Sequence, residues 1–221
     1  MSLFDARFFD LITHCSNPDS IKKMAFQAKQ SGYSGIGILN PSSDISKIDI
    51  PDDFSLFSSI EMACKPSAFR DEIRKNKGKK NILIVKGKDE DLDRIAVETE
   101  GLDILMQPAR INNIMAKIAA DNSVAIGFNI GSIIRNRGDS RARDLTIMRT
   151  NLMHARKYGT QIILTSDSHS PYDIRAPGEI VALSAIFGMT PKEAVIAMSA
   201  MPLDIMKKKN FDYLQEGIEI L

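Results

Sequence analysis

Short apolar runs alternate along this chain with segments whose apolar residues recur at helical spacing. Seven runs have the length and composition of buried strands, and they fall at residues 3–13, 33–39, 54–64, 81–85, 103–106, 123–130 and 161–164. Helical segments are predicted between and after them at residues 18–32, 67–73, 89–99, 111–120, 143–158, 176–187, 191–198 and 204–209. This alternation favours a parallel sheet with helices on its outside.

Local signals place several of these boundaries. Asn17 followed by Pro18 is a good helix cap with proline in the first turn, and Thr190 to Glu193 has the spacing of a capping box with Pro191 at the first position. The glycines of residues 33–39 indicate close approach of neighbouring backbone. Residues 40–53, with two prolines and several Ser and Asp, are predicted to form a loop.

The fold class that fits best is α/β, a closed or nearly closed TIM-like barrel of about seven mostly parallel strands with surrounding helices. An open doubly wound sheet is the alternative. It is disfavoured because no strand is followed by a glycine-rich phosphate loop. The length suits one domain, so we expect residues 1–210 to form a single barrel, with residues 211–221 as a tail of uncertain structure.

Composition narrows the class of protein without naming a ligand. A hydrophobic content of 43% with 26% charged residues is typical of a soluble globular protein, and the strand-sized apolar runs predict no membrane span. The start of the chain shows no secretory signal pattern. Cys15 and Cys64 are too far apart for a metal knuckle, so we expect free thiols in the cytoplasm. A net charge of +1 exerts no global attraction to nucleic acid.

The strongest candidate for chemistry is the segment QIILTSDSHSPYDIRAP at residues 161–177, where an apolar strand leads directly into polar residues. Functional side chains of β/α folds lie where a central strand ends. Asp167 and His169 suit metal ligation or acid/base chemistry, but they would serve equally to hold a turn by hydrogen bonds. The polar residues predicted at strand ends, and so at one shared rim, are His14, Glu61, Gln107, Asn129, Asp167 and His169.

Two of these assignments have simpler alternatives. His14 could be a packed core histidine, and Glu61 could pair with a nearby lysine such as Lys65. The basic residues also cluster, in one loop and one helix, at Arg135, Arg137, Arg141, Arg143, Arg149, Arg156 and Lys157. Arginine suits phosphate because its guanidinium can donate two parallel hydrogen bonds, although a run of charge is also typical of a solvated helix face.

Several segments together resemble a known family. From Gly127 onward, and above all in SDSHSPYDIRAP followed by GMTPKEA, the chain is similar to archaeal ribonuclease P protein component 3, the family that includes the eukaryotic thirty-kilodalton subunit of RNase P and RNase MRP. The segments FFDLITH, GYSGIGILN and SIEMACKP fit the same family, so the resemblance covers nearly the whole chain. It implies a distorted TIM-like barrel related to the PHP metal-dependent phosphoesterases.

That relationship implies a site that has lost metal ligands. The metal enzymes carry D-L-H-x-H in the first strand, whereas this chain has DLITH at residues 10–14 and keeps only the second histidine, His14. The second-strand T-D-H is replaced by LNP at residues 39–41, the mid-chain His-Pro by QP at 107–108, and a liganding Glu by Phe128. The retained positions are Glu61, Asp167 and His169. We therefore expect a vestigial pocket of His14, Glu61, Asp167 and His169, with no catalytic residue, no cofactor and no metal, or at most one weakly bound ion.

The function implied by the resemblance is that of a ribonuclease P subunit, which binds and stabilises the catalytic RNA for removal of 5′ leaders from precursor tRNA. The expected protein partner is component 2, in a heterotetramer. The expected RNA contacts are Arg110, Arg135, Arg137, Arg141, Arg143 and Arg175. Few aromatic residues lie among these arginines, so recognition by backbone and shape is expected rather than base stacking. The rival hypotheses are a PHP-type metal-dependent phosphoesterase and a barrel enzyme that binds a small phosphorylated ligand.

Overall fold

A computed structural model of the chain describes residues 6–15, 17–63, 68–76, 78–87 and 89–209. Its single sheet runs in chain order through β1 (Phe8–Thr13), β2 (Tyr33–Leu39), β3 (Ser55–Glu61), β4 (Asn81–Lys86), β5 (Ile104–Met106), β6 (Ala125–Asn129) and β7 (Ile162–Thr165). Every neighbouring pair is parallel. A parallel bridge between Thr13 and Ser168 brings the end of β1 back to the segment after β7. The predicted nearly closed barrel is confirmed.

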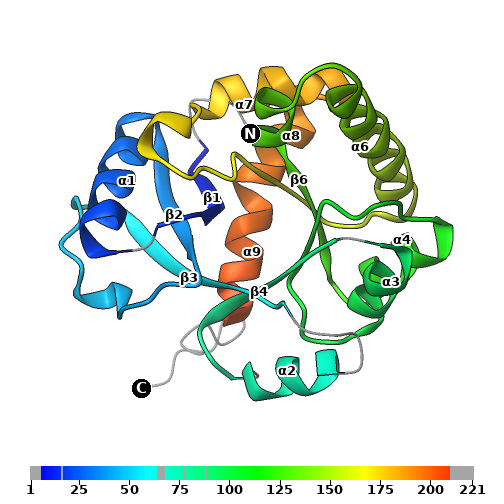
Figure 1. Cartoon of the computed structure of the whole chain (residues 1–221), viewed down its shortest axis with the longest axis horizontal. Helices are drawn as coiled ribbons and strands as arrows, with labels where there is room; N and C mark the ends of the chain where they lie inside the picture. The colour runs from blue at the N-terminus through cyan, green and yellow to red at the C-terminus, as the bar shows by residue number, and fades with distance from the viewer. Residues whose placement is uncertain (1–5, 16, 64–67, 77, 88, 210–221) are drawn as a thin grey trace.

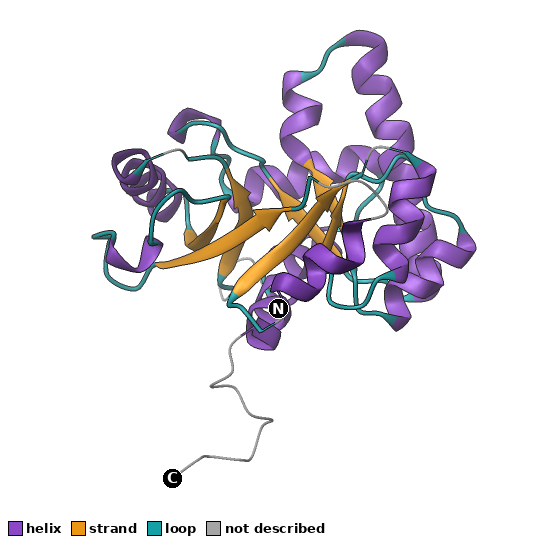
Figure 2. Ribbon diagram, turned by 60° about the horizontal axis from the view of Figure 1, so that its bottom comes forward, coloured by secondary structure: helices purple, strands orange, loops and turns teal. Residues whose placement is uncertain are grey.

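Helices surround this sheet, as Figures 1 and 2 show. They are α1 (Pro18–Gln30), α2 (Phe69–Asn76), α3 (Glu90–Glu98), α4 (Asn113–Asp121), α5 (Ile130–Arg135), α6 (Gly138–Tyr158), α7 (Pro177–Ser184), α8 (Pro191–Met198) and α9 (Ala200–Lys209). Short 3-10 turns lie at η1 (Ile45–Lys47), η3 (Pro171–Asp173) and η4 (Ala185–Phe187). Within the described residues, no helix combines the length and apolar character needed to cross a membrane.

The local signals at α1, β2 and α8 act as predicted. Asn17 and Thr190 each accept the backbone N–H of the third helical residue, with a reciprocal bond back to the cap. Close backbone approach explains Gly37, since a Cβ atom there would overlap the carbonyl oxygen of Leu11 on β1. Any larger residue at this position would push β1 and β2 apart.

Several predicted boundaries are wrong. The apolar run predicts strand up to residue 130 and a polar loop after it, but β6 ends at Asn129 and α5 begins at once, because the Asn129 side chain accepts the Ser132 N–H and caps the helix. Helix α6 starts at Gly138 rather than at residue 143, and α9 starts at Ala200 rather than at 204. Strand β3 ends at Glu61 and α2 extends to Asn76. Cys64, Lys65 and the tail at 211–221 lie outside the described residues.

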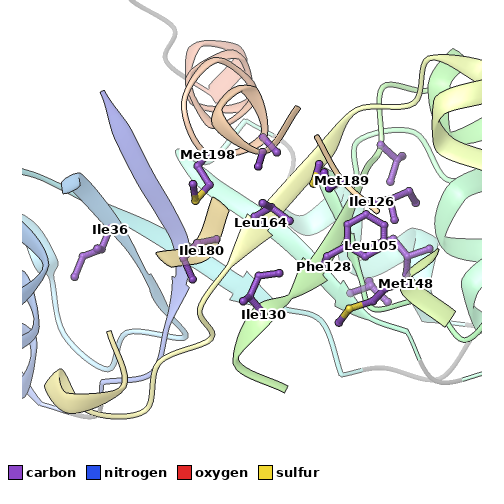
Figure 3. Close-up of a cluster of buried hydrophobic side chains, with 14 of the residues drawn as sticks. Ile36, Leu105, Ile126, Phe128, Ile130, Met148, Leu164, Ile180, Met189 and Met198 are labelled. Atoms are coloured by element: carbon purple, nitrogen blue, oxygen red, sulfur yellow. The ribbon is translucent and has the colours of Figure 1, made fainter. Parts of the chain in front are cut away.

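The barrel is buried on both faces, as a parallel sheet between helices requires. The strands supply two separate apolar clusters, and in β4 these alternate, with Ile82 and Ile84 facing the barrel interior while Leu83 and Val85 face the helices. Figure 3 shows part of the outer cluster, where Phe128 and Leu164 pack with residues of the surrounding helices. Helix α9 joins the inner cluster through Ile205 and Met206 and lies near the start of β5, where Lys209 pairs with Asp103 at 2.8 Å.

The first and last strands are joined by a buried carboxylate. One oxygen of Asp10 accepts the Thr165 hydroxyl at 2.5 Å and the Ile12 N–H at 3.2 Å. Its other oxygen accepts the backbone N–H of Ser166 at 2.8 Å and the Ser166 hydroxyl at 2.5 Å. Burial raises the pKa of Asp10, although these hydrogen bonds oppose the shift. Asp10 therefore closes the barrel with hydrogen bonds that strand pairing alone does not supply.

A second polar contact ties α6 to α8 and predicts a pH-dependent loss of stability. Arg156 pairs with both oxygens of Glu193, each at 2.7 Å, and also donates to the Gly188 carbonyl. These bonds, together with those from Thr190, lower the pKa of Glu193 to about 2. A group whose folded-state pKa is lowered stabilises the fold above its unfolded pKa and loses that contribution as the pH falls through the folded value.

Glu193→Gln should therefore lower the free energy of unfolding by about 1 kcal/mol near pH 7, a value kept small because both side chains are partly exposed. The difference from the parent protein should shrink between pH 4.5 and about 2 as Glu193 takes up a proton. Urea titrations at a series of pH values measure it. A difference that stays constant down to the lowest pH would show that the ion pair contributes nothing, and Glu72→Gln, which removes a more exposed pair with Lys75, provides the control.

Candidate functional site

The carboxyl ends of the strands form a polar rim at one end of the barrel. A small cavity there is lined by Ile12, His14, Leu39, Glu61, Ile84, Lys86, Met106, Gln107, Asn129 and Asp167. Five of the six residues that the sequence placed at a shared rim therefore line one cavity, and the sixth, His169, stacks on His14 with ring centroids 3.9 Å apart. The predicted convergence at the strand ends is present in the structure.

Asp167 is the centre of this rim. Its Oδ1 atom is hydrogen bonded to His14 Nε2 at 2.7 Å. Its Oδ2 atom accepts the Asn129 side-chain amide at 2.6 Å and an Arg135 guanidinium N–H at 2.8 Å. Arg135 donates a second bond to the Asp167 carbonyl at 3.1 Å. Both carboxylate oxygens are thus occupied by donors from the protein itself.

The surroundings of Asp167 and His169 determine the charge of each, and the two side chains lie 3.9 Å apart. Burial raises the pKa of Asp167, but the hydrogen bonds from His14 and Asn129 and the charge of Arg135 outweigh it, so the pKa lies below its ordinary value. Burial and the neighbouring His14 lower the pKa of His169. Asp167 is therefore a carboxylate at neutral pH, while the His169 imidazole is neutral.

The backbone at the rim is bent in an uncommon way. Asn40, Gln107 and Asp167 follow the ends of β2, β5 and β7, and all three have left-handed backbone with φ of 48°, 44° and 49°. Few residues other than glycine adopt this conformation, and it clusters where a chain must turn side chains toward a site. Gly131 permits the contact of α5 with β7, because a Cβ atom there would overlap the Ser166 carbonyl oxygen and crowd the Arg135 guanidinium.

The rim does not fit a pair of catalytic metal ions. Among the described residues, the ligand atoms close enough to share one ion come from His14, Asp167 and His169, within 4.8 Å of one another, and Glu61 lies outside this group. Sites with two metals need several ligands to hold ions about 4 Å apart. Here the Arg135 guanidinium, a cation, already neutralises Asp167. We therefore assign no reaction step to a metal at this rim.

The cavity is also too small for a substrate. Its volume is about 30 Å³, far below the roughly 300–1,000 Å³ of pockets that hold small organic ligands. Ile12, Leu39, Ile84 and Met106 contribute apolar side chains to its lining. A larger cavity of about 300 Å³ lies at the opposite end of the barrel, beside Glu100 and Lys209, and it shares none of the rim residues. The rim therefore keeps a network of polar side chains like that of an active site, but its cavity has no room for a substrate.

Three of the six arginines predicted to contact RNA are exposed, and the structure gives them no hydrogen bond or ion pair with any residue it describes. They are Arg110, Arg137 and Arg143. Arg137 is the residue before α6, and Arg143 lies in its first half. The fully buried residues of α6 all lie between Met148 and Ala155, and Arg143 faces solvent in the half of the helix that precedes them.

The loop that carries Arg110 is fixed by hydrogen bonds to buried side chains. Buried Asn151 accepts the Ile111 N–H and donates to the Pro108 carbonyl, each at 3.0 Å. Asp93, which is also buried, accepts the Ala109 N–H at 2.7 Å. Arg110 therefore projects from a fixed loop beside the rim.

The other three predicted RNA contacts donate hydrogen bonds within the chain. Arg135 is bound to Asp167 as described, with 39% of its side chain exposed. Arg141 donates to the Asn136 carbonyl at 2.8 Å and so holds the turn between α5 and α6. Arg175 donates to the carbonyls of Tyr172 and Ile174. For each of these arginines, part of the guanidinium is committed to the fold.

Sequence reasoning missed several residues that build this site. Lys86 ends β4 directly after an apolar run, so the rule that pointed to Glu61 and Asn129 would have found it. In the sequence Asp10 stands out only as the first residue of the segment DLITH, and no local pattern predicts that it is buried against the end of β7. The cap that Asn129 gives to α5 could have been seen from its spacing to Ser132.

Comparison with known proteins identifies relatives along nearly the whole chain. A protein family described as RNase P subunit p30 matches residues 7–211. "Ribonuclease P protein component 3" of Methanococcoides burtonii is 38% identical over 225 residues, covering 96% of this chain and 93% of the relative. The protein of the same name from Methanosarcina mazei is 34% identical, with 97% and 95% covered.

Solved structures support the same barrel. A chain from a cryo-EM structure of archaeal ribonuclease P with mature tRNA superposes with a TM-score of 0.78 at 22% identity, covering 96% of this chain and 97% of that one. The crystal structure of A. niger ochratoxinase has a TM-score of 0.63 at 13% identity, with 90% and 71% covered. At these identities the superpositions establish the fold alone.

Proposed function

Because the chain belongs to the RNase P subunit p30 family, we propose that it acts as a protein subunit of ribonuclease P and binds the catalytic RNA, which removes 5′ leaders from precursor tRNA. In this proposal the RNA performs the hydrolysis, and the protein stabilises the fold of that RNA. The rival metal-dependent phosphoesterase is not favoured, since the relatives are ribonuclease P components.

The observation that carries the proposal is the occupancy of Asp167. Hydrogen bonds from His14, Asn129 and Arg135 engage both oxygens of the carboxylate that a hydrolase of this fold would offer to a metal. At the same time, Arg110 and the arginines at the start of α6 remain available on the surface around the same end of the barrel. Guanidinium groups on rigid elements are suited to the phosphates of a folded RNA.

We place the contact with the component 2 protein on the paired helices α4 and α6. Ile114 and Met153 are 71% and 60% exposed there, beside the contact between Asn113 and His154 that joins the two helices. Exposed apolar side chains next to each other mark protein interfaces. Joined by a pair of component 2 chains, two copies of this protein would form the expected heterotetramer.

Reconstitution tests the proposed function. Ribonuclease P RNA and component 2 should cleave precursor tRNA faster when this chain is added, and most clearly at a magnesium concentration too low for the RNA to work alone. The isolated chain should hydrolyse no generic phosphoester, with or without Mn²⁺ or Zn²⁺. Cleavage that does not respond to the chain, or phosphoesterase activity of the chain by itself, would contradict the proposal.

A further inference from the structure

A groove between α1 and η3 carries exposed aromatic and basic side chains that the rim and the arginine surface do not use. Its volume is about 560 Å³, and it is lined by Lys22, Lys23, Phe26, Gln27, Pro171 and Tyr172. This volume is within the range of pockets that hold small organic ligands. Only Ser170 separates η3 from His169, so the groove lies close to the polar rim.

The two aromatic rings of the groove are unusually open to solvent. Tyr172 is 90% exposed and Phe26 is 55% exposed, whereas most large apolar side chains of this protein are buried. An aromatic ring loses favourable burial when it faces water. Two such rings along one groove therefore indicate a surface that another molecule covers.

The turn that presents Tyr172 is rigid. Pro171 is its first residue, and Arg175, which follows the turn, donates to the Tyr172 carbonyl at 2.9 Å. The Tyr33 hydroxyl in turn donates to the Arg175 carbonyl at 2.9 Å, so the turn is anchored to β2. The exposed ring thus projects from a fixed backbone, and little conformational entropy is lost when a flat group packs on it.

The charge beside the rings is positive and available. Lys23 is exposed and has no hydrogen bond or ion pair with the described part of the chain. Lys22 pairs with Asp49 at 2.6 Å, but the two side chains are 53% and 86% exposed. An ion pair so open to water is weak, and a phosphate can replace the carboxylate at little cost.

From this combination we propose that the groove binds an unpaired nucleotide of RNA, with its base stacked on Tyr172 and Phe26 and its phosphates beside Lys22 and Lys23. Stacking on aromatic rings combined with cations along the backbone is how proteins hold single-stranded nucleic acid. The proposal rests on the proposed function and adds a recognition mode to it, since a double helix keeps its bases stacked and presents only backbone and shape. An apolar segment of a protein would fit the rings but would gain nothing from the lysines.

The sequence contains no tryptophan, so a single introduced tryptophan can report on the groove by its fluorescence. Tyr172→Trp keeps a stacking ring at a position that is 90% exposed and makes it the single indole of the chain. Adding single-stranded oligoadenylate of roughly ten nucleotides should quench its fluorescence, and a fully paired RNA duplex of equal length should not. Met153→Trp, at the exposed α6 position, is the control and should stay unquenched.

The same proposal predicts the effect of removing the rings. Tyr172→Ala combined with Phe26→Ala should weaken oligoadenylate binding by about tenfold or more, while Tyr172→Phe should bind as the parent protein does. Circular dichroism melting confirms that each variant is folded, and both positions are exposed enough for the fold to tolerate the change. Equal affinity of the double Ala variant and the parent protein would overturn the proposal.

The outcomes separate this proposal from the function on which it rests. If the Tyr172→Trp variant is unquenched both by oligoadenylate and within a reconstituted complex that cleaves precursor tRNA, the groove does not stack RNA although the function stands. If oligoadenylate quenches the indole but the chain has no effect on cleavage, the groove is supported and the proposed function fails. An emission change that appears only with component 2 would assign the groove to a protein contact and overturn the proposal.

Discussion

Replacing Arg137 and Arg143 together with glutamine should weaken binding to ribonuclease P RNA by roughly tenfold to a hundredfold at moderate salt, because each guanidinium that neutralises a phosphate releases counterions from the RNA. Both residues lie at or near the start of α6, before its buried residues begin. The slope of log affinity against log salt concentration should become shallower by about two. Filter binding or fluorescence anisotropy across a salt series measures both effects.

A matched variant controls for the loss of charge. Arg74→Gln with Lys192→Gln removes two positive charges from exposed positions on α2 and α8, and it should leave affinity and salt slope almost unchanged. Arg135 is left out of the test because its bond to Asp167 would mix a structural effect with an RNA contact. If the Arg137 and Arg143 variant binds with unaltered affinity and salt slope, these two residues do not face the RNA.

Asp10→Ala should destabilise the protein by about 3–5 kcal/mol, the largest effect expected for a single substitution in this chain. The change removes the acceptor of four hydrogen bonds and leaves donors of Ile12, Thr165 and Ser166 buried without it. Because these bonds join β1 to β7, the loss should open the barrel at its seam. Urea denaturation followed by circular dichroism gives the free energy of unfolding.

Two further variants make the result specific. Asp10→Asn keeps one acceptor oxygen and should lose less stability than Asp10→Ala. Asp49→Ala removes a carboxylate that is 86% exposed and should change the free energy of unfolding by less than about 0.5 kcal/mol. A change of similar size for Asp10→Ala and Asp49→Ala would mean that the seam is closed by strand pairing and packing alone.

Local patterns predicted most of the elements of this fold. Seven apolar runs became seven strands, and the caps at Asn17 and Thr190 began their helices where their spacing indicated. The convergence of His14, Gln107, Asn129 and Asp167 also followed, since the carboxyl ends of parallel strands share one end of a barrel. Such features depend on periodicity and chain order, which a sequence displays directly.

What the sequence did not display are contacts between distant segments. Asp10 and Ser166 are 156 positions apart, and nothing near either residue signals their bond. In the sequence Arg135 cannot be told apart from the other arginines of its run, and only the fold shows that it donates a hydrogen bond to Asp167. Tyr172 and Phe26 are far apart in the chain, so the sequence could not indicate a shared aromatic groove, and the expectation that base stacking plays little part was limited to the arginine run.

The central claim is that this barrel supports a catalytic RNA and performs no hydrolysis at its own rim. The most direct test is the rate of leader removal by the reconstituted complex containing Asp167→Asn, measured per folded protein molecule under saturating RNA. Asparagine keeps the left-handed backbone of this position but replaces one of the two carboxylate oxygens. We predict a rate within about twofold of the parent complex, with lower thermal stability as the main effect, since each oxygen serves only hydrogen bonds of the fold. A loss of about a hundredfold or more in the rate, with the protein folded and the RNA still bound, would contradict the account and assign the chemistry to the rim.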